Sequence, residues 1–86
     1  MAKYKITIKK SAAKELETIP TKDLRRIVKR IGSLAENPRP PGSQKLSAHQ
    51  AHRIRQSDYR IVYSINDESA LIDIVKIGHR REIYRS

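Results

Sequence analysis

Residues 52–77, HRIRQSDYRIVYSINDESALIDIVKI, contain three successive runs in which apolar side chains recur at strand spacing. Alternation with a period of two predicts β-strands that turn one face to a core. Turn signals separate the runs at 57–58 and 66–69. The last run, 70–77, is mostly apolar and rich in Ile and Val, which is typical of a central strand, and Gly78 is expected to end it. The second half of the chain therefore predicts three consecutive strands.

The first half of the chain begins with another alternating run. Tyr4, Ile6 and Ile8 point to one side and mostly lysines point to the other, which predicts a strand with one wet face. A short helix is expected next, because apolar residues follow at helical spacing. Ser11 is its expected N-cap, and Pro20 is expected to end it.

A second helix has the clearest amphipathic pattern in the sequence, with Thr21 as its expected N-cap and Asn37-Pro38 as its stop. Its apolar stripe consists of Leu24, Ile27, Val28, Ile31 and Leu34. Its opposite face carries the basic residues Lys22, Arg25, Arg26, Lys29 and Arg30. A solvated helix face would show this pattern too. Only Asp23 and Glu36 fall among the basic residues of this helix, however, which favours a surface that contacts a phosphate backbone.

These runs predict a small α+β fold with the element order β-α-α-β-β-β. The two helices are joined by a short link and should form a hairpin that packs on a mainly antiparallel, twisted sheet. Residues 37–43, NPRPPGS, are interpreted as an ordered surface loop, and residues 44–51 are expected to be irregular. Because the parts on either side of this loop are too small to fold alone, residues 1–86 are expected to form a single domain.

The charge of the chain is its most informative compositional property. It carries 19 Lys plus Arg against 9 Asp plus Glu in 86 residues, a net charge of +10. So large a basic excess indicates a polyanionic partner, of which nucleic acid is the commonest. Residues 1–43 hold 11 basic and 4 acidic groups, a net of +7, and residues 44–86 hold 8 and 5, a net of +3. The excess therefore lies mainly in the first half.

Several classes of protein and of site do not fit the sequence. No apolar run approaches the roughly 18 residues of a membrane span, and the start has no apolar signal region. The absence of cysteine excludes a disulfide framework and fits the reducing cytoplasm, which is the expected location. Gly32, Gly42 and Gly78 lie too far apart for a phosphate-binding loop. His49 and His52 have no convincing companion ligands, so neither a metal nor another cofactor is expected.

Phosphodiester chemistry without a metal remains compatible with the residues present. Attack by an RNA 2′-OH needs a proton acceptor, a donor for the leaving 5′ oxygen and cations around the phosphorane. Arginine can supply the cations, and tyrosine or histidine the proton transfers. The side chains that could converge at one end of the sheet are Arg53, Arg55, Arg60, Arg80, Arg81 and Tyr84. Scattered surface arginines paired with Asp58, Asp73 and Glu82 would fit the spacing equally well.

Two motifs carry a family resemblance that covers essentially the whole chain. The first is DYRIVY at 58–63, within the longer run HRIRQSDYRIVYSI that follows Lys45-Leu46. The second is the tail GHRREIYR at 78–85. Together with the order β-α-α-β-β-β, they resemble the RelE-type toxins of bacterial and archaeal toxin–antitoxin modules.

This resemblance implies a function and a set of partners. RelE-type toxins are mRNA interferases that enter the ribosomal A site and cut mRNA there, with basic residues in place of a metal. They are held inactive by a cognate antitoxin whose C-terminal segment wraps the toxin. The implied partners are therefore an antitoxin, the ribosome and mRNA, and no membrane.

The resemblance also implies roles for individual residues. Arg53 and Arg55 match basic positions of the family's second strand, and Arg60 matches the phosphate and transition-state ligand. Arg80 matches the arginine of the Gly-x-Arg tail motif, and Tyr84 matches the terminal tyrosine. The further assignments are acid–base chemistry for His79, phosphate binding for Arg81 and docking on ribosomal RNA for Lys22, Arg25, Arg26, Lys29 and Arg30.

Two other functions fit the same residues. A ParE-like toxin has the same fold but poisons DNA gyrase by protein contact and has no nuclease site. A non-catalytic RNA- or DNA-binding module would need only the charge. The tail with Tyr84 and the basic pair Arg53 and Arg55 favour RNA cleavage, because the ParE-like group generally lacks them.

Overall fold

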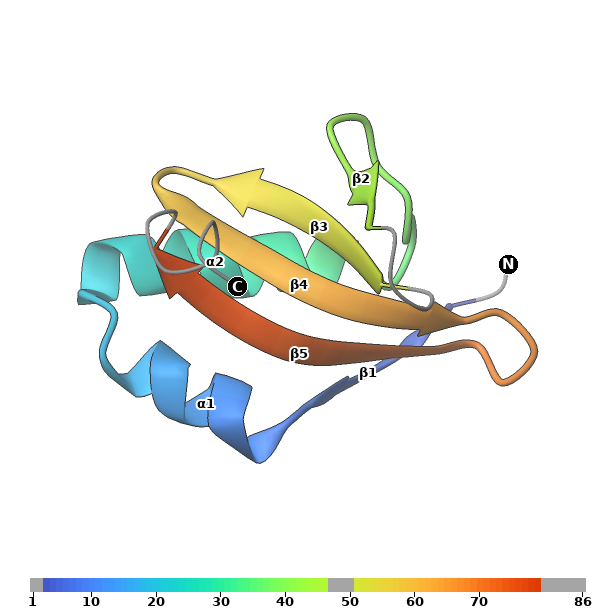
Figure 1. Ribbon diagram of the computed structural model, residues 1–86, viewed down its shortest axis with the longest axis horizontal. Coiled ribbons are helices and arrows are strands. Elements are labelled where there is room, and N and C mark those ends of the chain that lie inside the picture. Colours follow the sequence, from blue (N-terminus) through green and yellow to red (C-terminus); the bar gives the residue numbers. More distant parts are fainter. Residues whose placement is uncertain (1–2, 47–50, 80–86) are drawn as a thin grey trace.

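The computed structural model describes residues 3–46 and 51–79, and Figure 1 shows how its elements are arranged. In the first half, β1 (Lys5–Ile8) is followed by α1 (Lys10–Glu17) and α2 (Thr21–Ser33). The second half consists of β2 (Gln44–Lys45), β3 (Ala51–Gln56), β4 (Tyr59–Asn66) and β5 (Leu71–His79). The expected α+β class is confirmed, and the short strand β2 is added to the expected order.

The strands form one sheet in the order β1-β5-β4-β3-β2. The helices carry the chain from β1 at one edge to β2 at the other, and β3, β4 and β5 then lead it back across the sheet (Figure 1). β5 therefore ends beside β1 and runs parallel to it, whereas all other neighbours are antiparallel. The mainly antiparallel sheet expected from the sequence is confirmed.

One face of the sheet packs against the helices and buries the core. The helical half contributes Ala12, Ile19, Ile27, Ile31 and Leu34, and the strands contribute Ile54, Ile61, Tyr63, Ile65, Ile72, Ile74 and Ile77. Ile74 and Ile77 are an odd number of residues apart, which would place them on opposite faces of a regular strand. A shift in the pairing of β4 with β5 at Val62/Tyr63 lets both face the core.

Both expected N-caps are wrong. α1 begins at Lys10, so Ser11 lies inside the helix, and α2 begins at Thr21 itself. Only Lys9 separates β1 from α1, and Pro20 holds an extended backbone before α2, so each helix starts directly after its connection. Neither start has a side-chain cap. Among residues 3–46 and 51–79, no helix is long and apolar enough to cross a membrane.

The apolar stripe of α2 is narrower than the sequence predicts. Ile27 and Ile31 are buried and Leu24 is partly buried against the core, but Val28 is 52% exposed. Each residue advances about 100° around a helix of 3.6 residues per turn. Around the circumference of α2, the buried stripe therefore has its edge between Ile27 and Val28, and Val28 lies on the side that carries the basic residues.

The loop after α2 contains the strand that the sequence did not predict. The Ser43 amide donates to the Pro40 carbonyl at 3.0 Å, and Gly42 has a φ of 92°. A type II turn with proline at its second position needs such a glycine at its third. The turn directs Gln44–Lys45 along β3, so the expected irregular structure from residue 44 is wrong. Two paired residues are too short a run to leave a periodic pattern.

β5 continues to His79 instead of ending at Gly78 as expected. Gly78 is buried and pairs with Arg60 on β4. Beyond the end of β1, the outer edge of β5 faces α1, where the Ile77 amide donates to the Glu15 carboxylate at 3.0 Å. This carboxylate satisfies a backbone donor that a strand edge would otherwise leave open.

Candidate functional site

Three arginines share the face of the sheet that is turned away from the helices. Ile54 on β3 and Ile61 on β4 point into the core, and successive side chains on a strand point to opposite faces. Arg53, Arg55 and Arg60 therefore point away from the helices. Arg55 stands directly opposite Arg60 in the ladder, where side chains start about 5 Å apart.

These arginines line a hollow of about 290 Å³, called here the arginine hollow. Its walls are Arg30 from α2, Gly42 and Gln44 at the start of β2, and Arg53, Arg55 and Arg60. Arg60 is only 3% exposed, whereas Arg55 is exposed. Arg53 donates a hydrogen bond of 2.6 Å to the Gln44 side-chain oxygen, which orients its guanidinium.

The arginine hollow has a one-sided charge. Within the part of the chain that the structure describes, four guanidinium groups and no carboxylate line it. Like charges placed together repel each other unless an anion lies between them, and the planar guanidinium matches the geometry of a phosphate. The arrangement can therefore hold a phosphate and stabilise additional negative charge on it.

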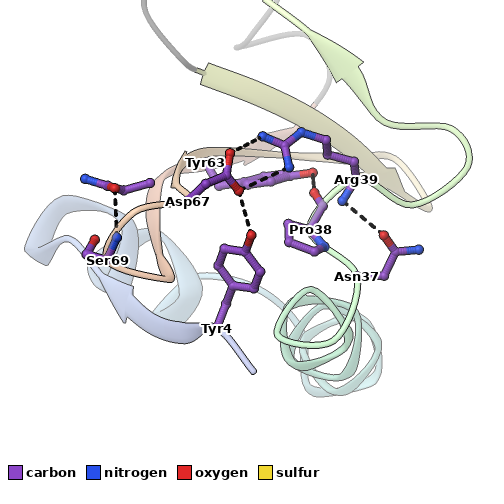
Figure 2. A network of polar contacts seen from close by, with 8 residues as sticks. Tyr4, Asn37, Pro38, Arg39, Tyr63, Asp67 and Ser69 are labelled. Atoms are coloured by element: carbon purple, nitrogen blue, oxygen red, sulfur yellow. Dashed lines mark hydrogen bonds and ion pairs between the residues drawn. The ribbon is translucent and has the colours of Figure 1, made fainter. Parts of the chain in front are cut away.

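A second polar cluster lies beyond the other end of β4, and Figure 2 shows it from close by. It consists of Tyr4, Arg39 and Asp67 and is called here the anchor network. The Tyr4 hydroxyl donates to Asp67 at 2.6 Å, and Arg39 donates to both Asp67 oxygens at 2.9 and 3.4 Å. Beside it, the Tyr63 hydroxyl donates to the Pro38 carbonyl at 2.7 Å. These bonds tie the start of β1 and the loop after α2 to the β4–β5 turn.

The anchor network shifts the pKa values of its members. The Arg39 guanidinium, and after it the Tyr4 hydroxyl, lowers the pKa of Asp67 below its ordinary value. The hydrogen bond to Asp67 raises the pKa of Tyr4 and also that of Arg39. Tyr4 and Arg39 therefore keep their protons and Asp67 stays ionised. The positive charge of Arg39 is balanced within the network by the carboxylate of Asp67.

His52 lies next to the anchor network on the core face. It is 7% exposed and stacks on Tyr63 with ring centroids 5.7 Å apart. Burial lowers the pKa of His52, and the positive charges of Arg39 and Lys45 act in the same direction. The neutral imidazole is therefore the form that fits this position.

A larger hollow of about 450 Å³ lies on the helix side, between α1 and the end of β5. Lys14 and Glu15 bring both signs of charge to it, and the rings of Tyr59 and His79 meet edge to face at 5.7 Å. Its larger volume does not make it the better candidate, because it lacks the one-sided charge that a polyanion would require.

Comparison with known proteins identifies the family of the chain. A family model described as "ParE toxin of type II toxin-antitoxin system, parDE" matches residues 6–84. Toxin RelE from Mycobacterium tuberculosis is 32% identical over 84 residues, which cover 95% of this chain and 87% of that toxin. The chain belongs to the RelE-type toxins of the RelE/ParE superfamily.

Solved structures of related toxins share the fold of this RelE-type toxin. The toxin–antitoxin complex RelBE2 from Mycobacterium tuberculosis matches with a TM-score of 0.81 and 25% identity, over 93% of this chain and 94% of that one. The archaeal RelE–RelB complex from Pyrococcus horikoshii matches with a TM-score of 0.82 and 30% identity, over 93% and 97% of the two chains.

The structure brings together part of the predicted site of the toxin. Arg53, Arg55 and Arg60 converge on the arginine hollow as the spacing suggested. His79 does not join them, because its partner in the ladder is Tyr59 and both rings lie on the helix side of the sheet. The predicted residues that lie outside the described part of the chain are Arg80, Arg81 and Tyr84, and their roles stay predictions.

The alternative that the arginines pair with nearby acids involves Asp58, Asp73 and Glu82, of which the structure describes the first two. Asp58 and Asp73 are not among the residues that line the arginine hollow. Asp73 instead accepts a hydrogen bond of 3.1 Å from the Thr7 hydroxyl. Glu82 lies outside the described residues.

Sequence reasoning missed three parts of the arginine hollow. Gln44 and Gly42 belong to the turn and short strand that it took for irregular chain. Arg30 was assigned to the docking face of the second helix, but it is partly buried and lines the hollow. The proline-glycine turn at 40–43 is the one local signal that could have pointed to the missing strand.

Proposed function

We propose that this toxin is a ribosome-dependent endoribonuclease that cuts mRNA in the ribosomal A site. The observation that carries the proposal is the arginine hollow, where four guanidinium groups from α2, β3 and β4 line one cavity. Such a site suits a phosphate that gains charge during reaction better than a ground-state anion.

The proposed reaction is attack of an RNA 2′-OH on the neighbouring phosphorus. The 2′-oxygen–phosphorus bond forms as the bond from phosphorus to the 5′ oxygen breaks. The 2′-OH gives its proton to a base, and an acid protonates the leaving 5′ oxygen, so the products are a 2′,3′-cyclic phosphate and a 5′-OH. Arg60, which is buried and lines the hollow, is proposed to hold the phosphorane, while Arg53 and Arg55 hold the substrate phosphate.

Tyr84 is proposed to take part in one of these proton transfers, on the strength of the tail motif. Arg80 and Arg81 are proposed as further phosphate ligands for the same reason. His79 is less suited to acid–base work than the motif suggests, because the sheet separates its ring from the arginine hollow. The guanidinium groups supply the positive charge, so the proposal requires no metal or other cofactor.

We infer that a cognate antitoxin silences the toxin, since two related toxins were solved in toxin–antitoxin complexes. An antitoxin segment that covers the arginine hollow needs acidic side chains to match its charge. The exposed basic residues of α2 are proposed to dock on ribosomal RNA, and the site of action is then the cytoplasm.

Primer extension on a translated message, in cells that express the toxin without antitoxin, tests the proposal. We expect new 5′ ends within the reading frame, and we expect them to vanish when the start codon is removed. Toxin with Arg60→Gln serves as the control and should leave the message intact. Growth arrest with an intact message would overturn the nuclease assignment.

A gyrase inhibitor is the second candidate, because the matching family model is described as a ParE toxin. In that case the arginine hollow would contact protein rather than RNA. Relaxed plasmid DNA that accumulates beside intact mRNA would support this candidate. Cut mRNA with normally supercoiled plasmid would exclude it.

A further inference from the structure

A second basic hollow shares Arg30 with the arginine hollow and lies between α2 and the end of β3. Its volume is about 280 Å³, and it is lined by Arg26, Lys29, Arg30, Ser33 and Gln56. The lining consists of three cations and two neutral polar side chains, with no carboxylate in the described part of the chain. This second hollow therefore has the same one-sided charge as the first.

Arg30 is the residue that joins the two hollows. It lies on α2 and lines both of them. Its Nε is buried and, among the described residues, has no hydrogen-bond acceptor. A buried guanidinium donor without a partner is costly, and an anion is the partner that suits it best. The Arg30 guanidinium can therefore donate to an anion that lies where the two hollows meet.

We propose that the second hollow binds a phosphate of the same RNA strand whose scissile phosphate lies in the arginine hollow. This deepens the proposed function and rests on it for the identity of the strand. Each hollow is slightly smaller than the about 300–1,000 Å³ of typical ligand pockets, and it fits part of a polymer rather than a whole small ligand. Adjacent hollows of like charge suit successive phosphates of one chain.

The proposal divides the basic residues of α2 into two groups. Arg26, Lys29 and Arg30 line the second hollow and serve the substrate strand. Lys22 and Arg25 are exposed, do not line either hollow and remain for docking on ribosomal RNA. The sequence showed one basic face, because helical spacing does not reveal which side chains border a neighbouring strand.

The test measures binding of two single-stranded RNA probes to the full chain. Both probes are 2′-O-methylated throughout, so they lack the attacking hydroxyl and cannot be cut. A dinucleotide offers one phosphodiester, and a hexanucleotide reaches both hollows. Arg26→Gln should weaken binding of the hexanucleotide about tenfold, the size expected for a charge-assisted hydrogen bond, and leave the dinucleotide unchanged.

Arg25→Gln is the matched control, because it removes one exposed arginine from the neighbouring position of the same helix. It should change binding of either probe by less than twofold. Arg30→Gln should weaken both probes, since Arg30 lines both hollows. Equal losses for Arg25→Gln and Arg26→Gln would overturn the proposal, as would an Arg26→Gln defect seen with ribosomes but not with the hexanucleotide.

These outcomes separate the inference from the proposed function. If the toxin cuts mRNA but Arg26→Gln behaves like its control, the second phosphate site is wrong and the nuclease remains. If no mRNA is cut but Arg26→Gln selectively weakens the hexanucleotide, the site is real and the nuclease is wrong.

Discussion

Arginine side chains occupy two contrasting surroundings in this toxin. In the anchor network, Arg39 donates to both oxygens of Asp67, and Tyr4 donates to the same carboxylate (Figure 2). In the arginine hollow, Arg55 and Arg60 stand opposite each other on β3 and β4, and Arg30 and Arg53 line the same cavity. Both places lie along β4, with Arg60 near the start of this strand and Asp67 directly after its end.

The contrast separates structural charge from functional charge. An arginine matched by a carboxylate holds two chain segments together, and its charge is largely balanced by that partner. Guanidinium groups that line one cavity provide positive charge that a bound anion can use. We therefore expect changes at the anchor network to affect stability, and changes at the hollow to affect RNA cleavage.

The largest effect is expected for Arg60→Gln. Loss of one preorganised donor to a charged transition state typically lowers a rate by about 10²–10³. We expect a decrease of this size in ribosome-dependent cleavage, measured with purified ribosomes and a defined message. Far-UV circular dichroism and a cooperative thermal unfolding transition should confirm a folded variant. Wild-type cleavage by this variant would remove Arg60 from the proposed mechanism.

A smaller effect is expected on the salt dependence of RNA binding. Each phosphate contact contributes about one unit to the slope of log affinity against log salt concentration. Arg55→Gln should therefore reduce this slope by about one for an uncleavable RNA. Arg39→Gln removes the same charge outside the hollow and should leave the slope as in the wild type. Equal slopes for the three proteins would argue against phosphate binding at Arg55.

Tyr63→Phe tests the expectation that changes beside the anchor network affect stability rather than cleavage. Its hydroxyl bonds the Pro38 carbonyl from a fully buried ring, and the net contribution of such a bond is about 0.5–1.5 kcal/mol. We expect the free energy of unfolding in urea to fall by this amount while cleavage stays at the wild-type rate. A loss of cleavage without a loss of stability would show that this end of β4 also serves function.

The smallest effect is expected on the pH dependence of stability, to which the titration of His52 contributes. Because its folded pKa is lowered, the unfolded chain binds the proton more strongly, and stability falls as pH drops below the ordinary histidine pKa of about 6.5. The His52→Gln variant should lose this decline below about pH 6.5 in thermal unfolding curves. An unchanged decline would assign it to another group, since Asp67, whose pKa is lowered, acts only at more acidic pH.

The sequence predicts those parts of the toxin that local periodicity controls. Alternation identified β3, β4 and β5, and it placed Arg53 and Arg55 on one face opposite Ile54. It did not predict β2, because two residues make no pattern, nor the helix starts, because short connections overrode the capping preference of Ser11 and Thr21.

Contacts between distant segments were beyond prediction from local pattern. Asp67 lies 28 residues from Arg39 and 63 from Tyr4, and no spacing rule connects them. The approach of Arg30 to the arginine hollow depends likewise on how α2 packs beside β3. The roles proposed for the hollow arginines come from the family resemblance, while their surroundings come from tertiary packing.

The most direct test of the contrast compares Arg55→Gln with Arg39→Gln, since each removes one exposed arginine charge. Ribosome-dependent cleavage and thermal unfolding are measured on the same preparations. We predict that Arg55→Gln loses cleavage and keeps the wild-type melting temperature, and that Arg39→Gln keeps cleavage and melts at a lower temperature. Cleavage lost equally in both variants, or a melting temperature lowered only by Arg55→Gln, would contradict the division of structural and functional charge.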